Sequence, residues 1–150
     1  EIMRLVKLAA AVVAIFGIST FGHAAIAETC DTPLPDDLAI QTPAPDISKE
    51  RIQFLGVWGN GKWDGVLCNT LLVQDIDAKG NVKTIYSWGT YNGWDIWEGK
   101  GPGGFKFIAD NKIQSKFRNG AVVTYWIEGK AMKGTYVRNG YTTRVTLVRK

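Results

Sequence analysis

The sequence predicts an all-β fold: an eight-stranded antiparallel up-and-down barrel, preceded by a signal peptide and a disulfide-tethered acidic linker. From Phe54 onward, apolar and polar residues alternate in short runs, and turn signals separate most runs at intervals of about ten residues. No stretch after Lys49 has the apolar periodicity of an amphipathic helix. Closing the strands into a barrel removes open sheet edges, and an open two-sheet sandwich is the alternative fold.

Residues 1–27 have the pattern of a signal peptide. Two basic residues are followed by a short apolar run over residues 8–16 and by an A-x-A cleavage site at Ala25–Ala27. The apolar run is short for a membrane-spanning helix. We therefore expect cleavage before Glu28 and a periplasmic or secreted bacterial protein with no transmembrane segment after cleavage. A retained N-terminal anchor is the alternative.

Residues 28–50 form a Pro-rich acidic linker, and residues 51–150 form the barrel domain. The linker holds six acidic residues, one lysine and four of the five prolines, a composition that does not bury a core. Residues 51–150 hold fifteen basic and seven acidic residues, with most of the excess after residue 111. This excess indicates an anionic envelope surface as partner, or solvated outward charges that discourage edge pairing. The linker folding back over the basic face is a third interpretation, and nucleic acid is not an expected partner.

Export makes the two cysteines and the single histidine informative. In an oxidising compartment Cys30 and Cys68 are expected to form a disulfide that ties the linker to the barrel. Two free thiols, or a bridge between molecules, are the alternatives. Cleavage removes His23, the only histidine, which excludes Ser-His-Asp and Cys-His mechanisms and His-ligated zinc or haem. We expect no enzyme activity, cofactor or metal, although a hydrolase that uses carboxylates alone is not excluded.

Turn chemistry and alternation define the expected strands. The two copies of Arg-Asn-Gly, at residues 118–120 and 138–140, predict tight hairpin turns, because Asn-Gly favours positive φ at both turn positions. Alternation places Phe117 and Tyr141 on the inward face of their strands. The expected strands are Gly56–Asp64, Thr70–Ile76, Val82–Tyr91, Phe105–Ala109, Lys112–Phe117, Ala121–Glu128, Ala131–Arg138 and Tyr141–Arg149.

The start of the expected barrel resembles a known superfamily. Within "FLGVWGNGKWDG", Gly56-Val57-Trp58 is similar to the G-x-W opening of calycins, the small barrels of the lipocalin and avidin type. The resemblance implies that Trp58 closes the base of the barrel and that an arginine on the last strand, Arg144 or Arg149, packs across it by a cation–π contact. The sequence also resembles small exported bacterial barrel domains that accompany hydrolases as non-catalytic partners.

The candidate binding site is the aromatic segment "SWGTYNGWDIWEGKGPGGF", residues 87–105. We expect a glycine-rich connection at one end of the barrel, where the rings stack on a ligand or else pack as a lid. Asp95 and Glu98 beside them are interpreted as solvated loop carboxylates rather than as a glycosidase pair. The segment "DIDAKGN" is rejected as a calcium loop, because Lys79 stands at a ligand position. The candidate ligand-binding residues are Trp88, Tyr91, Trp94, Trp97 and Phe105.

These features favour a binding module over an enzyme. The expected ligand is a small apolar, aromatic or saccharide molecule held at the aromatic rim. The alternative is a non-catalytic structural or accessory domain of the bacterial cell envelope, with a fully packed interior, that contacts a partner protein or an anionic surface.

Overall fold

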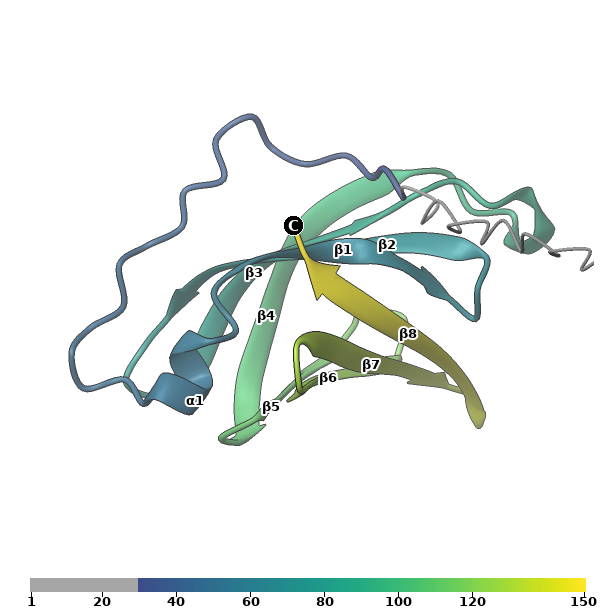
Figure 1. Ribbon diagram of the computed structural model, residues 1–150. Coiled ribbons are helices and arrows are strands. Elements are labelled where there is room, and N and C mark those ends of the chain that lie inside the picture. Colours follow the sequence, from purple (N-terminus) through teal and green to yellow (C-terminus); the bar gives the residue numbers. More distant parts are fainter. Residues whose placement is uncertain (1–29) are drawn as a thin grey trace, which may run out of the picture.

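The computed structural model describes residues 30–150, which form a closed antiparallel barrel in the order β1 to β8 (Figure 1). The expected signal peptide, its cleavage site before Glu28 and His23 lie outside the described residues. A four-residue helix, α1, precedes the first strand. The elements are α1 (Lys49–Ile52), β1 (Gly56–Trp63), β2 (Leu67–Ile76), β3 (Asn81–Trp88), the 3-10 turn η1 (Asn92–Trp94), β4 (Gly99–Ala109), β5 (Lys112–Lys116), β6 (Val122–Glu128), β7 (Ala131–Arg138) and β8 (Tyr141–Arg149).

The all-β, up-and-down topology is confirmed, and the strand bounds agree closely except around β4. The sequence predicted a connection up to Phe105, but β4 begins at Gly99 and pairs with β3 from Trp88↔Gly99 to Asn81↔Lys106. Glycine is weak in strands because it offers no side chain to pack. Here that absence is needed, since a Cβ at Gly99 would lie 2.6 Å from the Trp88 ring.

The two ends of the barrel differ. The end that carries α1 is the base, and it holds the β2–β3, β4–β5 and β6–β7 turns. The opposite end is the mouth, with the β3–β4 connection (residues 89–98) and the β5–β6 and β7–β8 turns (Figure 1). Both Arg-Asn-Gly turns are at the mouth. Asn139 and Gly140 both have positive φ as expected, whereas in the other turn only Gly120 has it and Asn119 does not.

The interior toward the base is filled by side chains. Phe54, Leu71, Phe105, Tyr125 and Met132 are each no more than 1% exposed and belong to one hydrophobic cluster. A buried polar chain crosses this core: the Tyr125 hydroxyl donates to Asn69 Oδ1 at 2.6 Å, and Asn69 Nδ2 donates to the Ser87 carbonyl at 2.9 Å. Buried polar groups are costly unless paired, so this network fixes the register of β2, β3 and β6.

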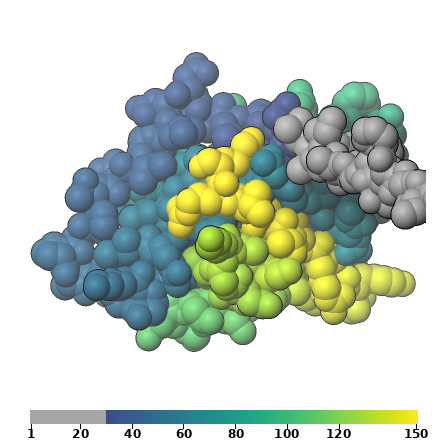
Figure 2. Space-filling view, viewed as in Figure 1, coloured from purple at the N-terminus to yellow at the C-terminus, as the bar shows by residue number. Residues whose placement is uncertain are grey.

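The segment over residues 31–48 runs along the outside of the barrel (Figures 1 and 2). The disulfide Cys30–Cys68 is confirmed and attaches the segment to β2. Further along, Thr32 Oγ1 donates to Thr70 Oγ1, Ser87 Oγ donates to the Pro33 carbonyl, and the Gln41 amide donates to the Gln74 carbonyl. These contacts are with β2 and β3, so the segment does not cover the basic strands β5–β8. Within residues 30–150, no helix is long and apolar enough to cross a membrane.

Candidate functional site

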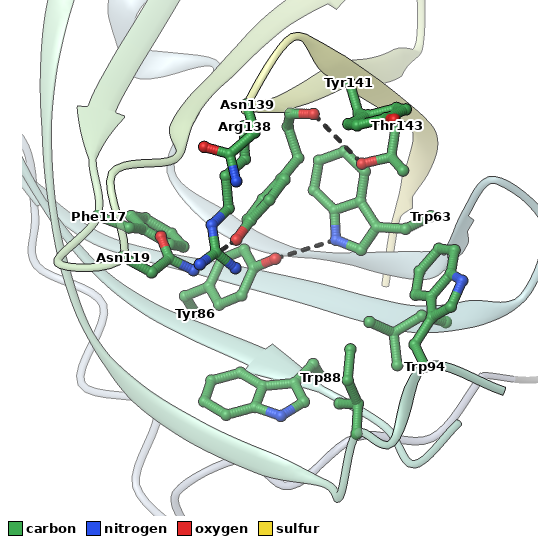
Figure 3. Close-up of a pocket in the computed structure, with 13 residues that line it drawn as sticks. Trp63, Tyr86, Trp88, Trp94, Phe117, Asn119, Arg138, Asn139, Tyr141 and Thr143 are labelled. Atoms are coloured by element: carbon green, nitrogen blue, oxygen red, sulfur yellow. Dashed lines mark hydrogen bonds between the residues drawn. The ribbon is translucent and has the colours of Figure 1, made fainter. Parts of the chain in front are cut away.

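The mouth of the barrel contains an apolar cavity of about 570 Å³ that opens to solvent (Figure 3). Its walls combine aromatic rings from β1, β3, β7, β8 and the β5–β6 turn with residues of the β3–β4 connection. One positively charged side chain and no carboxylate belong to the lining. The lining residues are Trp63, Leu67, Tyr86, Trp88, Trp94, Ile96, Phe117, Asn119, Tyr136, Arg138, Asn139, Tyr141 and Thr143.

Five of the rings, those of Trp63, Tyr86, Trp88, Phe117 and Tyr136, form one connected cluster. Tyr86 meets Trp88 at 5.8 Å and Phe117 at 5.1 Å between ring centroids, and Tyr136 meets Trp63 at 6.0 Å. Edge-to-face and tilted pairs at these separations are favourable beyond the area that they bury. The Phe117 ring also lies near Phe105 below it, which joins the cavity wall to the packed core.

Most polar groups of these rings already have partners within the protein. Trp63 Nε1 donates to the Tyr86 hydroxyl at 3.0 Å, as Figure 3 shows. Trp88 Nε1 donates to the Trp97 carbonyl at 2.8 Å, and Asn119 Nδ2 donates to the Tyr136 hydroxyl at 2.6 Å. The aromatic wall of the cavity therefore presents mainly ring faces to an occupant, and the free hydrogen-bond donors belong to Arg138 and Asn139 at the rim.

Burial changes the ionisation of two tyrosines. Burial raises the pKa of Tyr86 above its usual value, which its hydrogen bond from Trp63 partly opposes. Desolvation raises the pKa of Tyr125, deeper in the core, well above that of a free tyrosine. Both hydroxyls stay neutral at ordinary pH, so Tyr86 in the cavity wall and Tyr125 in the core beneath it carry no charge.

Next to the aromatic cavity, β4 presents glycines to the interior of the barrel. Cross-strand partners share a face of the sheet, so Gly101, opposite Tyr86, faces inward. A Cβ at Gly101 would have no atom within 4 Å, which marks open space inside the wall. Beside it, β4 and β5 pair only through Lys106–Ala109 and Lys112–Gln114, so the two strands separate toward the mouth.

A second cavity of about 710 Å³ occupies this gap between β4 and β5. It shares Tyr86, Trp88, Phe117 and Asn119 with the first cavity, so the two are adjacent. The remaining wall is the glycine-rich part of β4 on one side and the end of β5 on the other. These residues are Gly101, Pro102, Gly103, Gly104, Ser115, Lys116 and Arg118.

Two of the five predicted ligand-binding residues line the aromatic cavity, and a third supports them. Trp88 and Trp94 are in the lining. Tyr91 packs edge-on against Trp94 at 5.3 Å between centroids, and its backbone pairs with Ile96 to fold the connection back on itself. Trp94 is 41% exposed, so its ring covers only part of the mouth and leaves it open.

The other two predicted residues lie elsewhere. Trp97 is 74% exposed, does not line the cavity, and contributes only its carbonyl to Trp88. Phe105 is 1% exposed and packs against Phe117 and Tyr125 in the core beneath the cavity. Phe105 comes after the inward-facing glycines along β4, where the barrel interior is filled by side chains.

Sequence reasoning missed most of the wall, namely Trp63, Tyr86, Phe117 and Tyr136. Alternation did place Phe117 and Tyr141 on inward faces, and both belong to the lining. Tyr141, at the start of β8, is nevertheless 81% exposed, because it stands at the rim and not inside the barrel. Alternation within β3 and β7 would have placed Tyr86 and Tyr136 inward as well.

The base is closed by a contact between the first and last strands. The Arg149 guanidinium lies 4.2 Å from the centroid of the Trp58 ring. Gly56 has φ +117°, and a Cβ there would lie 2.8 Å from Arg149 Nη1. Arg144, the other arginine that the resemblance suggested, has an exposed side chain and contributes only backbone hydrogen bonds to Asp64.

The carboxylates near the aromatic segment form no catalytic arrangement. Asp95 sits at the end of η1 with φ 52°, and both it and Glu98 are exposed. Neither lines either cavity. Among residues 30–150, no group of three or more metal-ligating side chains comes together. In the rejected calcium segment, Asp77 accepts hydrogen bonds from the amide and side chain of Asn81, which closes the β2–β3 turn.

Comparison with known proteins gives no relative for this barrel. No protein-family model, no curated protein and no solved structure matches the chain. The architecture, an eight-stranded antiparallel closed barrel, is consistent with a calycin-like barrel.

Proposed function

We propose that the protein is an exported, non-catalytic binding module that holds a small apolar or aromatic molecule in the mouth of its barrel. The observation that carries this proposal is the cavity itself: about 570 Å³ walled mainly by tryptophan, tyrosine and phenylalanine rings. Cavities of a few hundred Å³ with apolar, aromatic walls and few polar groups are typical of small-molecule sites. A fully packed accessory domain would leave no such space.

The hydrogen bonding of the rings favours an apolar or aromatic ligand over a saccharide. A sugar needs many hydrogen-bond partners once it leaves water, because unpaired buried hydroxyls are costly. The indole N–H groups of Trp63 and Trp88 already donate to protein acceptors. The ring faces that remain free gain most from contact with another apolar surface, at about 25 cal/mol per Å² buried.

Export is proposed on two features. The N-terminal sequence has the pattern of a cleaved leader, and Cys30 and Cys68 are joined in the folded protein. Structural disulfides of this kind persist in oxidising compartments such as the bacterial periplasm.

A titration with N-phenyl-1-naphthylamine, an uncharged aromatic dye, tests the proposal. Three cavity tryptophans make binding visible both by dye emission and by quenching of protein fluorescence. We expect saturable binding with one dye per protein. A protein that leaves the dye emission unchanged at micromolar concentrations would refute the binding function.

Two tryptophans of the same connection form a matched pair for this titration. Trp94→Ala removes a ring from the cavity wall, whereas Trp97→Ala removes an exposed ring outside it. We expect Trp94→Ala to weaken dye binding about fivefold to tenfold, the effect of losing one stacking partner of about 1 kcal/mol. Trp97→Ala is expected to leave the affinity unchanged. Equal effects of the two variants would show that the dye binds elsewhere.

A further inference from the structure

The two Arg-Asn-Gly turns, which the proposed function does not use, meet at the mouth of the barrel. Asn119, Arg138 and Asn139 line the aromatic cavity, and Arg118 and Asn119 line the adjacent cavity. The turns are twenty residues apart in sequence but belong to neighbouring hairpins, β5–β6 and β7–β8. Figure 3 shows the Arg138 side chain projecting over the cavity, near Asn119.

The guanidinium groups of these turns have no partner among residues 30–150. Neither the Arg118 nor the Arg138 side chain makes a hydrogen bond, an ion pair or a ring contact there. Two other arginines of the barrel are engaged: Arg51 pairs with Asp110, and Arg149 donates to backbone carbonyls. The mouth therefore holds two sets of unused guanidinium donors.

No carboxylate in the cavity linings neutralises this charge. The two linings contain Lys116, Arg118 and Arg138 and no aspartate or glutamate. Asp95 and Glu98 belong to the β3–β4 connection, but both are exposed and outside the linings. The result is a cationic rim on one side of an apolar cavity.

From this arrangement we infer that the ligand is amphiphilic: an apolar or aromatic body with a carboxylate, sulfonate or phosphate group held at Arg138 and Arg118. This inference rests on the proposed function and names the chemical class of the ligand. Each guanidinium offers planar donors that match such oxyanions. The amide of Asn139, which has no hydrogen bond within residues 30–150, is a further donor beside them. An apolar body below the anion lowers the local dielectric and strengthens the attraction.

A pair of dyes separates the contribution of the anionic group to the affinity from that of the apolar body. 1-Anilinonaphthalene-8-sulfonate has the ring skeleton of N-phenyl-1-naphthylamine with one added sulfonate. We expect the sulfonate dye to bind about tenfold tighter at low salt, the effect of one or two charge-assisted hydrogen bonds. The preference should shrink as salt is raised, because the guanidinium groups are exposed to screening ions.

The double variant Arg118→Gln/Arg138→Gln tests which residues make the difference. It should abolish the preference for the sulfonate dye, because binding of that dye weakens about tenfold while binding of the uncharged dye changes much less. Lys130→Gln is the control, since it removes one positive charge from the exposed β6–β7 turn at the base. Equal binding of both dyes to the unaltered protein, or a preference that survives the double variant, would overturn the inference. Failure of both dyes to bind would overturn the proposed function instead.

An anionic amphiphile can reach the cavity as a free molecule or as a membrane lipid, so the probes are compared in both forms. Dodecanoate and dodecanol below their aggregation limits represent the free form. Vesicles of phosphatidylglycerol and of phosphatidylcholine represent the membrane. We expect arginine-dependent preference for dodecanoate over dodecanol. Arginine-dependent sedimentation with phosphatidylglycerol vesicles, without binding of dodecanoate, would assign the arginines to a membrane surface and contradict an anion site at the cavity.

Discussion

Arg149, on the last strand, lies across the ring of Trp58, on the first strand, with 4.2 Å between the guanidinium carbon and the ring centroid. Its two terminal nitrogens donate to the carbonyls of Leu55 and Gln53 at 2.7 and 2.6 Å. On the other edge of the ring, Trp58 Nε1 donates to the Phe54 carbonyl. The Arg149 side chain thus links the last strand of the barrel to the first strand and to the residues just before it.

Replacing Arg149 with methionine should destabilise the barrel. The variant keeps an apolar stem but loses the cation–π contact and both hydrogen bonds, for an expected cost of about 1 to 3 kcal/mol. Urea denaturation followed by tryptophan fluorescence measures the loss. Arg144→Met is the control from the same strand, because the exposed Arg144 side chain makes no hydrogen bond or ion pair within residues 30–150. A comparable loss in both variants would mean that the contact with Trp58 contributes nothing specific.

Filling the space beside Gly101 should remove ligand binding without unfolding the protein. Gly101→Leu adds a side chain on the inward face, where a Cβ meets no atom within 4 Å. We expect the melting temperature to stay the same or rise, since leucine adds apolar packing, and the affinity for N-phenyl-1-naphthylamine to fall at least about tenfold. Lys106→Leu is the control, because Lys106 is exposed on the alternate face of β4 and lines neither cavity. Undiminished binding by Gly101→Leu would show that the space beside Gly101 is not part of the binding site.

High pH should destabilise the fold through its buried tyrosines. Below about pH 10 a tyrosine is neutral in both the folded and unfolded states, so it adds no pH dependence. Above that pH the unfolded chain ionises while Tyr86 and Tyr125, whose folded pKa values are raised, stay protonated. The folded state then binds more protons, and stability falls as pH rises, by up to about 1.4 kcal/mol per pH unit for each tyrosine.

The variant Tyr86→Phe/Tyr125→Phe should lower that alkaline slope. Its free energy of unfolding is measured from pH 9 to 12 and compared with its own value at pH 7, because loss of the Tyr125–Asn69 hydrogen bond lowers the baseline. An unchanged slope would show that these two hydroxyls ionise as readily in the folded barrel as in the unfolded chain.

Reduction of Cys30–Cys68 should cost stability but preserve the barrel. The bridge spans 38 residues of sequence, and closing a loop of that size stabilises by about 3 to 4 kcal/mol in the chain-entropy model. The strands close on themselves through β1 and β8, independently of the bridge. Thermal melts should therefore show a lower midpoint with reductant than without it, and the far-UV circular dichroism spectrum of the folded protein should be the same in both. Identical midpoints would show that the segment over residues 31–48 is held by its hydrogen bonds alone.

The alternating pattern predicted seven of the eight strands to within a few residues, and β4 shows why the eighth was incomplete. Residues 99–104 contain four glycines and a proline, which read as a loop by composition. In the fold these residues pair with β3, and their inward positions suit glycine. The Trp88 ring leaves no space for a side chain at Gly99, and Gly101, opposite Tyr86, borders open space. That requirement comes from side chains on another strand, and local propensity does not contain it.

The candidate site was predicted only in part, and the reason is similar. Trp94 and Trp97 stand in the same connection with similar neighbours, so composition did not separate a wall residue from an exposed one. Their orientations follow from the Tyr91↔Ile96 pairing and from Asp95 in the left-handed conformation. Trp63 and Tyr136 are 73 residues apart, and only the register of the whole barrel brings them together.

A crystal structure of the complex with N-phenyl-1-naphthylamine tests the central claim most directly. We expect the dye inside the mouth, with its rings against Tyr86, Trp88 and Trp94 and its edge toward Arg138. Dye bound on the outer surface, or a mouth closed by inward movement of the β3–β4 connection with no room for the dye, would contradict it.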